Sequence, residues 1–391
     1  MIIKTKFLKK YKSGYPLLVK EALENPVHIP EEGTIIDFTD FRGNFICRGY
    51  IGLQNKGIGW MLTTDCSYQI DSDFFNRKLK ESVCFRKDFY RNKDTDCFRV
   101  FNGEGDGIGG ITVDNYAGFY LINWYNKGIY KFNEEIISAL ESCCEVKGIY
   151  QKKRFESTKQ ITENDSFVKG TLAPSPLLVI ENNVNFSIYL EDGAMVGVFL
   201  DQREVRQKIR HDFSSNKAVL NTFSYTGAFS IFAALGKAKT TVSVDLAKRS
   251  LPKTKEHFEI NNINPGNNKI IVEDIFNYFK YAKRKNLKFD LVILDPPGFA
   301  QSKKFKFSSA RDYPFLLKEA IEITSKHAVI VASTNNSKFD MEKFKSFVLK
   351  AFVGDTSKFR ILEEFRLPKD FRTNPNFQEG NYLKVLFIQI T

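Results

Sequence analysis

A short segment, VILDPPGFAQSKKFK (residues 292 to 306), runs four apolar residues into the carboxylate of Asp295 and then into two prolines. Prolines donate no backbone hydrogen bond and restrict φ, so they end a strand and fix the loop that follows. A carboxylate held at such a point can orient a ligand or accept a proton. An aromatic residue, Phe299, and a cluster of lysines come next. The segment therefore predicts a chemical site at the end of a strand.

Polar residues are also expected at the ends of four other strands, at Asn221, Asp245, Asp274 and Thr334. In an open α/β sheet, ligands bind outside the carboxyl ends of the strands, where the strand order reverses. At that edge Asp245 can accept both hydroxyl groups of a ribose, and Asp274 can receive an exocyclic amine such as that of adenine. An isolated aspartate at a strand end is more often a helix N-cap. Three aspartates at successive strand ends favour a ligand-binding edge.

The first of these strand ends, VLNTFSYTGAFS, carries one glycine, Gly227, where a helix must begin. Its missing Cβ lets the backbone approach a ligand closely. The segment lacks the GxGxxG pattern, which argues against a pyrophosphate at this turn. Its bulky, uncharged residues suit an amino acid or a sulfonium better.

These residues belong to a regular alternation of apolar strands and amphipathic helices that begins near residue 217. Helices separate strands that are expected at 218–223, 241–246, 269–274, 289–295 and 328–333. Such alternation predicts a parallel sheet covered by helices on both faces. Two late runs, 360–367 and 382–390, predict consecutive strands, an ending that favours one subclass of Rossmann-like fold.

The first half of the chain shows a different sequence pattern. Residues 33 to 64 predict short strands broken by glycine turns, as in a small β-barrel, and a helical segment follows near 72 to 92. The glycines of NGEGDGIGG (residues 102 to 110) precede a strand, ITVDNY, and not a helix, which favours a plain turn over a phosphate loop. A helix near 131 to 144 and a strand near 146 to 151 complete a compact α+β unit.

Length and composition predict a globular protein of two or three domains, with 391 residues, 42% hydrophobic and 27% charged. No segment resembles a signal peptide or the roughly 20 apolar residues of a membrane span, so we expect a cytoplasmic protein. The formal charge is +12, and residues 181 to 391 hold 33 Lys and Arg against 23 Asp and Glu, a net charge of +10. A basic half attracts a polyanion such as RNA or DNA. An AT-rich genome would enrich Lys, Asn, Phe and Ile in the same way.

Together these motifs resemble the class I S-adenosylmethionine-dependent methyltransferases, and among them the three-domain 23S ribosomal RNA 5-methylcytosine methyltransferases. The resemblance covers almost the whole chain, and its most specific parts are VFNGEGDGIGGITVD, DGAMVGVFLDQREVR, VLNTFSYTGAFS, VSVD and LDPPGFAQSKK. It implies an α/β fold with a PUA-like β-barrel in residues 1–70, a middle α+β domain in 71–175 and a Rossmann-like methyltransferase domain in 176–391. It also implies S-adenosyl-L-methionine as the cofactor, 23S ribosomal RNA as the partner and, as is frequent in the family, a homodimer.

The resemblance further implies roles for individual residues. The loop from Phe223 to Gly227 would hold the methionine end of the cofactor, Asp245 its ribose and Asp274 its adenine. Gln202 and Arg203, just before the sheet, would line the same pocket, although FLDQREVR alone also reads as a strand that ends at a helix cap with solvated arginines. The family shares an asparagine at the position of Asn221. The residues assigned to the cofactor are thus Gln202, Arg203, Asn221, Phe223, Ser224, Tyr225, Thr226, Gly227, Asp245, Asp274 and Asp295.

On this interpretation the rigid loop holds Asp295 and Phe299 towards the methyl group that is transferred. Phe299 can stack on a base extruded from the RNA. The phosphates that flank this base suit Lys303, Lys304, Lys306 and Arg311. A phenylalanine packed in the core and a solvated run of lysines are the alternative.

The chain departs from the family at one catalytic position. Carbon 5 of cytosine is a poor nucleophile, and the family is understood to activate it by adding a cysteine thiolate to carbon 6. The segment VIVASTNNS has Thr334 where that cysteine is expected, and all six cysteines lie at or before residue 144. They form no CxxC pair and no zinc-like spacing with histidine, so no metal site is expected.

A threonine hydroxyl is a much weaker substitute for the thiolate. It is essentially un-ionised without a dedicated base, whereas a thiol near pKa 8.5 supplies some thiolate at neutral pH. None of the four histidines is an obvious base, and only His327 is near Thr334 in sequence. Two interpretations stay open, an N-methylated base or 5-methylcytosine made by another arrangement. Asp295, Phe299 and Thr334 are the expected catalytic residues in both.

Three functions are compatible with the sequence. The first is a methyltransferase that acts on a base of large-subunit ribosomal RNA. The second is a dinucleotide-dependent oxidoreductase, since Asp245 would also suit the ribose of NAD, but the absence of GxGxxG and the DPPGF loop argue against it. The third is a non-catalytic RNA-binding or ribosome assembly factor that has lost its chemistry with its cysteine.

Overall fold

The computed structural model describes residues 1–391 except 55–56, 156–165, 194–195 and 302–305. Its internal contacts divide the chain into two compact units. Unit 1 consists of Met1–Ile180, Ile188–Val196 and Lys369–Gly380, and unit 2 consists of Glu181–Ser187, Gly197–Pro368 and Asn381–Thr391. The three domains divided at 70/71 and 175/176 stay a prediction.

The first part of unit 1 is a four-stranded antiparallel sheet with the order β1-β4-β3-β2. Its strands fall in the region where glycine turns and alternating residues predict them. The elements are α1 (Thr5–Lys12), β1 (Leu17–Val19), the 3-10 helix η1 (Lys20–Ala22), β2 (Ile35–Thr39), β3 (Phe45–Gln54) and β4 (Gly57–Thr63).

The second part of unit 1 is a five-stranded sheet with the order β5-β6-β7-β8-β9, in which only β7 and β8 are parallel. The predicted helices and strands of this region are confirmed. Its elements are α2 (Ser72–Phe85), α3 (Lys87–Tyr90), β5 (Cys97–Asn102), η2 (Gly103–Gly105), β6 (Ile111–Tyr116), β7 (Phe119–Trp124), α4 (Lys127–Tyr130), α5 (Asn133–Cys143), β8 (Gly148–Lys153) and β9 (Phe167–Gly170). A two-stranded sheet of β10 (Leu177–Glu181) and β11 (Val184–Ile188) follows. All of β10 but Glu181 belongs to unit 1, and all of β11 but Ile188 belongs to unit 2.

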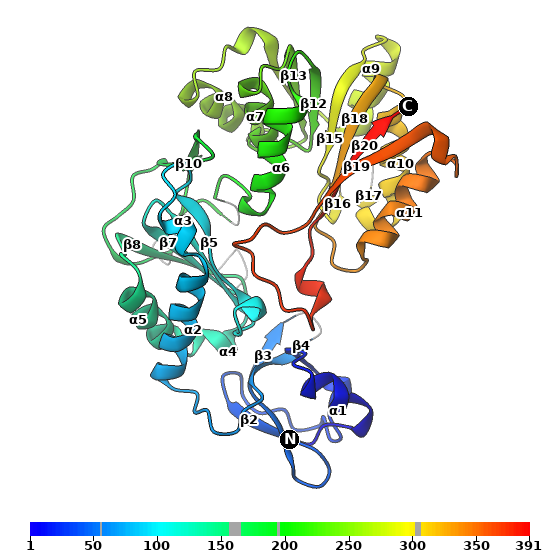
Figure 1. Ribbon diagram of the computed structural model, residues 1–391. Coiled ribbons are helices and arrows are strands. Elements are labelled where there is room, and N and C mark those ends of the chain that lie inside the picture. Colours follow the sequence, from blue (N-terminus) through cyan, green and yellow to red (C-terminus); the bar gives the residue numbers. More distant parts are fainter. Residues whose placement is uncertain (55–56, 156–165, 194–195, 302–305) are drawn as a thin grey trace. The chain divides into compact units, whose positions relative to one another are not determined.

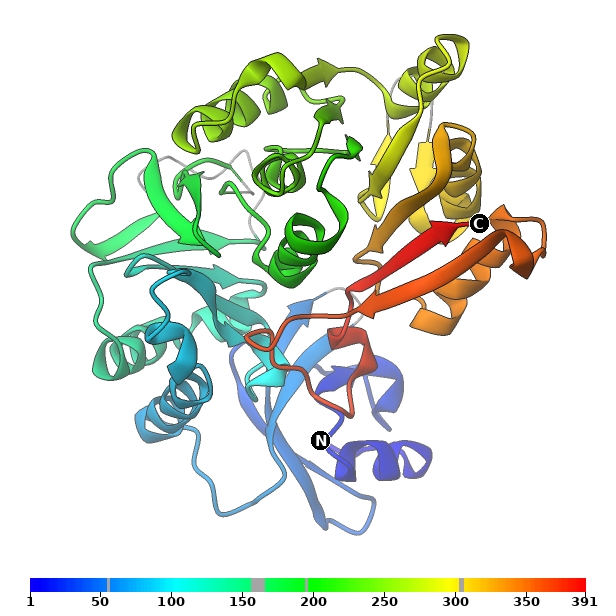
Figure 2. The same ribbon diagram turned by 45° about the horizontal axis from the view of Figure 1, so that its top comes forward.

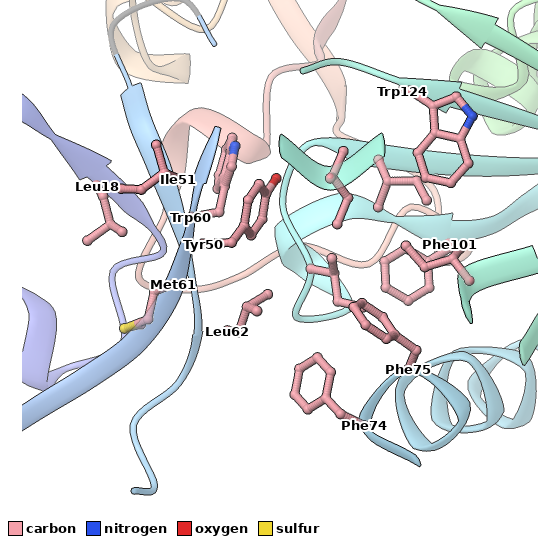
Figure 3. Close-up of a cluster of buried hydrophobic side chains, with 14 of the residues drawn as sticks. Leu18, Tyr50, Ile51, Trp60, Met61, Leu62, Phe74, Phe75, Phe101 and Trp124 are labelled. Carbon is pink, nitrogen blue, oxygen red and sulfur yellow. The ribbon is translucent and has the colours of Figure 1, made fainter. Parts of the chain in front are cut away.

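One hydrophobic core joins the two parts of unit 1 (Figure 3). Tyr50 and Trp60 come from the first sheet, and Phe74, Phe101 and Trp124 come from α2, β5 and β7, yet all five belong to the same buried cluster. None of these side chains is more than 4% exposed. The two parts therefore stabilise each other through shared burial of large aromatic residues.

Unit 1 also contains a late segment of the chain, Lys369–Gly380, which includes η8 (Gln378–Gly380). It lies against the glycine-rich turn after β5, where a Cβ atom on Gly105 would come within 1.8 Å of a backbone oxygen of the segment. Beside this turn Arg86 is fully buried, pairs with Asp106 at 2.7 Å and donates from Nε to the backbone oxygen of Asp370 at 2.9 Å. The predicted plain turn is confirmed, and its glycines permit close packing of backbone on backbone.

Unit 2 is built on a seven-stranded sheet with the order β14-β13-β12-β15-β18-β20-β19 (Figures 1 and 2). The first five of these strands are parallel, and β20 is antiparallel to both β18 and β19. Every predicted strand of this half is present. They are β12 (Ala218–Thr222), β13 (Thr240–Asp245), β14 (Asn268–Val272), β15 (Phe289–Leu294), β18 (Thr324–Thr334), β19 (Phe359–Phe365) and β20 (Lys384–Ile390).

Helices cover both faces of this sheet, as the alternation predicts. Figures 1 and 2 show α6 and α7 on one face, with α8 beside α7, and α9, α10 and α11 on the other. The buried side chains of β15 alternate accordingly, because Leu291 and Ile293 pack in one cluster with α6 and α7 while Val292 and Leu294 pack in the other. The helices are α6 (Arg203–Lys208), α7 (Ala228–Leu235), α8 (Ser250–Ile260), α9 (Ile275–Arg284), α10 (Ser309–Ile321) and α11 (Met341–Ala351).

The remaining elements of unit 2 are short. They are η4 (Leu200–Gln202), the π-helix η5 (Ile209–Phe213), η6 (Pro265–Asn267), β16 (Phe299–Gln301), β17 (Lys306–Ser308) and η7 (Thr356–Lys358). α10 begins at Ser309, five residues before Pro314, and includes this proline. No helix of the described residues is both long and apolar enough to cross a membrane.

Candidate active site

The strand order of unit 2 places the site. β12 pairs with β13 on one side and with β15 on the other, so the order along the sheet reverses at β12. The ends of β12, β13 and β15 therefore share one edge of the sheet with the end of β18. Open α/β sheets bind ligands at such an edge.

The loop after β12 has an unusual backbone. Phe223, Tyr225 and Gly227 all have positive φ angles, of 53°, 50° and 78°. Two non-glycine residues in this region store strain, which persists only where the surroundings hold it. Here the backbone N–H of Ser224 donates to the oxygen of Val244 at 3.1 Å. The loop is therefore pre-shaped by its neighbour β13.

Gly227 is the N-cap of α7, and its position leaves no room for a side chain. A Cβ atom at this position would lie 2.4 Å from Cγ2 of Thr254 on α8. The hydroxyl groups of Ser224 and Thr254 are buried and have no hydrogen-bond partner among the described residues. Buried hydroxyl groups usually find partners. One unsatisfied hydroxyl on the loop and another on α8 thus accompany a close-packed turn, and a bound polar ligand can satisfy such hydroxyls.

A buried histidine supports the same loop. His257 on α8 accepts a hydrogen bond at Nε2 from the backbone N–H of Ser187 at 3.1 Å, and its Nδ1 lies 2.9 Å from the oxygen of Thr226. This geometry fits the neutral ring with its proton on Nδ1. Burial lowers the pKa of His257, so the ring stays neutral and structural. The side chain of Thr226 donates to the oxygen of Gly197 at 2.8 Å.

Asp245 ends β13 and holds the loop from the other side. Its Oδ2 accepts from the backbone N–H of Tyr225 and its Oδ1 from that of Ala247, both at 2.8 Å. Each carboxylate oxygen has two lone-pair sites. Asp245 can therefore hold the loop and still accept the two hydroxyl groups of a ribose.

Asp274 is the N-cap of α9, which is the ordinary role of an aspartate at a strand end. Its Oδ1 accepts from the backbone N–H groups of Phe276 and Asn277 at 3.0 and 3.3 Å. Its Oδ2 accepts no hydrogen bond from the described residues. The cap therefore uses one oxygen and leaves the other for an amine.

Asp295 directly follows β15, which ends at Leu294 as the two prolines predict. Its Oδ2 accepts from Nε2 of Gln202 at 2.7 Å, and Oε1 of Gln202 accepts from the hydroxyl of Ser333 at 3.2 Å. Burial raises the pKa of Asp295 to about 6, the nearby charge of Asp201 raises it further, and the hydrogen bonds from Ser333 and Gln202 oppose this. A carboxyl group of this kind gains or loses its proton near neutral pH.

The loop after Asp295 is held at its far end. The oxygen of Gly298 accepts from both the backbone N–H and the hydroxyl of Ser309 at 3.1 and 3.3 Å, and Asn336 donates to that hydroxyl at 2.9 Å. The hydroxyl of Tyr313 donates to the oxygens of Leu294 and Ser333. The ends of β15 and β18 are thereby joined beneath the loop.

Phe299 opens β16, and 58% of its side chain is exposed. It is therefore available for stacking and is no core residue. Arg311 is exposed and pairs with Asp312 at 2.8 Å. Lys303 and Lys304 lie outside the described residues, and the structure describes the backbone of Lys306 but not its side chain.

Thr334 ends β18 with its side chain fully buried, and its hydroxyl oxygen accepts from the backbone N–H of Asn336 at 3.3 Å. His327 lies seven residues earlier on the same strand, roughly 23 Å away at about 3.3 Å per residue, and cannot serve as its base. Asn221 on β12 is buried, and its side-chain amide donates to the hydroxyl of Ser230 on α7 at 3.0 Å.

The two residues before the sheet are buried rather than solvated. Gln202 is 6% exposed and Arg203 is 5% exposed. Arg206 on the same helix is 1% exposed and forms two hydrogen bonds of 2.7 Å with the buried Glu181. Gln202, which ends η4 just before α6, reaches Asp295 at the sheet edge, whereas Arg206 is held by Glu181.

Sequence reasoning missed several residues of this edge. Asp201 lies close enough to raise the pKa of Asp295, and it accepts from the hydroxyl of Tyr382 at 2.9 Å. Phe199 is 41% exposed, and its ring centre lies 5.4 Å from that of Tyr225. Ser333 bonds to Gln202. The placement of Ser333 beside Thr334 was the only signal in the sequence that could have indicated one of them.

The described residues contain no cluster of three or more histidine, cysteine or acidic side chains that could hold a metal ion. All six cysteines are free thiols and belong to unit 1. Two of them, Cys66 and Cys84, are exposed.

Comparison with known proteins gives two family matches. Residues 166–388 match the family described as S-adenosylmethionine-dependent methyltransferase, and residues 1–64 match a PUA-like domain.

Individual relatives match over the whole chain. YwbD of Bacillus subtilis, which carries the name of a ribosomal RNA large subunit methyltransferase, is 51% identical over 100% of this chain and 99% of its own. Ribosomal RNA large subunit methyltransferase I of Aeromonas salmonicida is 28% identical over 96% of this chain and 95% of its own. The crystal structure of SMU.776, described as a methyltransferase in complex with S-adenosylhomocysteine, is 36% identical with a TM-score of 0.92, over 100% of this chain and 99% of its own.

Proposed function

The chain belongs to the family of S-adenosylmethionine-dependent methyltransferases, and from this premise we propose that it methylates a base of large-subunit ribosomal RNA. The observation that supports this most is that a half-buried carboxyl group, Asp295, and an exposed aromatic residue, Phe299, lie on the same proline-containing loop at the carboxyl edge of the sheet. A carboxyl group and a free aromatic face together suit a flipped base, whose polar edge and ring plane both need partners.

We assign the cofactor to the edge formed by β12, β13 and β14. The strained loop 223–227 would hold the amino acid end, Asp245 the ribose and Oδ2 of Asp274 the adenine amine. The buried hydroxyl of Ser224 and the missing Cβ of Gly227 fit this assignment. When bound, S-adenosylmethionine supplies a methyl group on a positively charged sulfur. Gln202 and Asp295 would then face this methyl group, while Arg203 and Asn221 support the pocket.

The atom that receives the methyl group has two candidates. The family resemblance favours carbon 5 of cytosine. The buried Thr334 and the absence of cysteine from residues 145–391 favour a nitrogen, whose lone pair needs no covalent activation. Phe299 would stack on the base in either case, and the lysines of 303–306 with Arg311 would bind its phosphates.

The test is mass mapping of ribosomal RNA from a strain that lacks the gene, complemented with the wild-type chain or with D295N. One nucleotide of 23S ribosomal RNA should lack 14 Da without the gene, regain it with wild type and not regain it with D295N. Nucleoside chromatography then separates 5-methylcytidine from N-methylated nucleosides. Identical maps in all strains would instead favour a non-catalytic RNA-binding or assembly factor. The homodimer stays a prediction, which light scattering of the purified chain tests.

A further inference from the structure

A buried lysine lies at the same sheet edge and has no place in the assignment above. Lys384 is the first residue of β20 and pairs directly with Thr334, the last residue of β18. Because β20 is antiparallel, it starts at the edge where the parallel strands end. Lys384 therefore lies at the edge that also carries Asp295.

Thr334 and Lys384 face the same side of the sheet. Ala332 and Leu386 form the next pair on this side, and both belong to the cluster beneath α10 and α11. Directly opposite residues of an antiparallel pair have Cβ atoms about 4.5–5.5 Å apart. A lysine side chain is long enough to reach the hydroxyl of its partner, although in the structure Nζ of Lys384 bonds to the backbone oxygen of Tyr382 and not to Thr334.

The amine of Lys384 is buried without a carboxylate. Its side chain is 2% exposed, its Nζ donates to the backbone oxygen of Tyr382 at 2.7 Å, and it lies 5.4 Å from the ring centre of Phe339. Lys384 forms no ion pair with any residue that the structure describes. Its charged neighbours are Arg366, which disfavours an ammonium ion, and Asp340, which favours it.

This environment makes the amine easier to deprotonate than that of an exposed lysine. Burial and the charge of Arg366 lower the pKa of Lys384 to about 8, and the opposing effect of Asp340 is smaller. A buried ammonium ion is normally retained with a paired carboxylate. A lysine whose Nζ bonds to a backbone oxygen and to no carboxylate of the described residues is suited to act as a base.

Methylation requires a proton acceptor when the modified atom of the nucleobase carries a hydrogen, as carbon 5 and the exocyclic amine of cytosine do. At such an atom a hydrogen is replaced by a methyl group that arrives with one positive charge, so a neutral product requires the loss of one proton. We propose that Lys384 is the general base that accepts the hydroxyl proton of Thr334, and that this pair removes the proton from the nucleobase. This inference rests on the proposed function. The bond between the modified atom of the nucleobase and its hydrogen breaks, and the electron pair of this bond stays on the nucleobase. The proton moves to Oγ1 of Thr334 as the threonine proton moves to the lone pair of Nζ.

The pair is consistent with the hydrogen bonds around it. Oγ1 of Thr334 accepts from Asn336, which leaves its hydrogen to be donated elsewhere. Thr334 has the position at which the resembling family carries its cysteine, and the amine supplies a base that neither His327 nor the buried His257 can. Lys384 acts here through Thr334 as a positioning and proton-accepting residue.

The test combines methyl transfer with a direct titration. Single-turnover transfer of a labelled methyl group to 23S ribosomal RNA from the deletion strain is measured between pH 6 and 9.5 for wild type, K384M, K384R and T334V. The rate of the wild type should rise with pH and level off above about pH 8. All three variants should lose at least about 100-fold in rate together with the pH dependence that levels off near 8. K326M, which changes an exposed lysine at the other end of β18, is the matched control and should behave as wild type.

Two further measurements separate the possible failures. Carbon NMR of labelled lysine should show one signal, absent in K384R, that titrates near pH 8 without substrate. Binding of S-adenosylhomocysteine should stay within about twofold in all variants, which shows that they are folded. A wild type without transfer activity contradicts the proposed function alone. An active K384R that keeps the wild-type pH dependence, or a Lys384 signal that titrates above pH 10, contradicts the role of Lys384.

Discussion

Replacing Asp295 with asparagine should stabilise the protein while it removes activity. Folding shifts the pKa of Asp295 from 3.8 to about 6, mainly through burial. This difference corresponds to roughly 3 kcal/mol, at about 1.4 kcal/mol for each pKa unit. The ionised carboxylate therefore destabilises the folded state, and an asparagine of the same shape does not carry this cost. Active sites commonly trade stability for function in this way.

The sign of the effect with pH is fixed by linkage. Below pH 3.8 the side chain is protonated in both states and contributes no difference. Between pH 3.8 and 6 the folded state keeps the proton that the unfolded state loses, so the wild type loses stability as pH rises. The stability difference between D295N and wild type should therefore grow from near zero at pH 4 to about 3 kcal/mol above pH 7. Taking the difference cancels every other titrating group.

The assay must report on unit 2. Both tryptophans, Trp60 and Trp124, lie in unit 1, so their fluorescence is uninformative for Asp295. Hydrogen exchange measured on peptides from β15 and β18 gives the local free energy of opening, and peptides from β3 and β4 serve as an internal control. A stability difference that is independent of pH, or a D295N variant that is less stable than wild type at pH 7.5, would refute the burial argument.

Three further predictions concern the same unit. Phe299→Ala should weaken RNA binding by about 5- to 150-fold, since stacking contributes about 1–3 kcal/mol per base, and should leave the affinity for S-adenosylhomocysteine unchanged. F315A, at a 50% exposed phenylalanine on α10, is the control. Equal losses in both variants would argue against a specific stack. Gly227→Ala should weaken binding of S-adenosylhomocysteine by at least about tenfold, because a Cβ would lie 2.4 Å from Thr254 at a φ of +78°. In calorimetry the double variant G227A/T254A should recover part of this affinity. Full affinity in G227A alone would show that the loop is not close-packed. Arg206→Met should lower the free energy of opening of α6, measured by hydrogen exchange, by about 3–5 kcal/mol, because Glu181 is left buried without its partner. The double variant R206M/E181Q should recover much of this loss. A loss below about 1 kcal/mol would show that the pair is not desolvated.

The elements of unit 2 could be predicted from the sequence because each depends on local pattern. Period-two burial, N-capping aspartates and the prolines after Asp295 act within a few residues, and strands end where these signals place them. The carboxylates at the strand ends followed from the same pattern, since the carboxyl ends of parallel strands share an edge.

Contacts between distant parts of the chain could not be predicted in this way. The bond from Gln202 to Asp295 spans 93 residues, and Lys384 meets Thr334 only because β20 inserts between β18 and β19. The segment Lys369–Gly380 gave no sign that it packs with unit 1. A lone lysine at the start of the apolar run VLFIQI was the one visible hint of the buried amine.

The central claim, that this sheet edge binds the methyl donor with its reactive end towards Asp295, is tested most directly by a crystal structure of the chain with S-adenosylhomocysteine. We expect the ribose hydroxyls within about 3 Å of Asp245, the adenine amine at Asp274 and the sulfur pointing towards the loop that carries Phe299. A nucleoside bound away from Asp245 and Asp274, or a sulfur directed away from Asp295, would contradict the account.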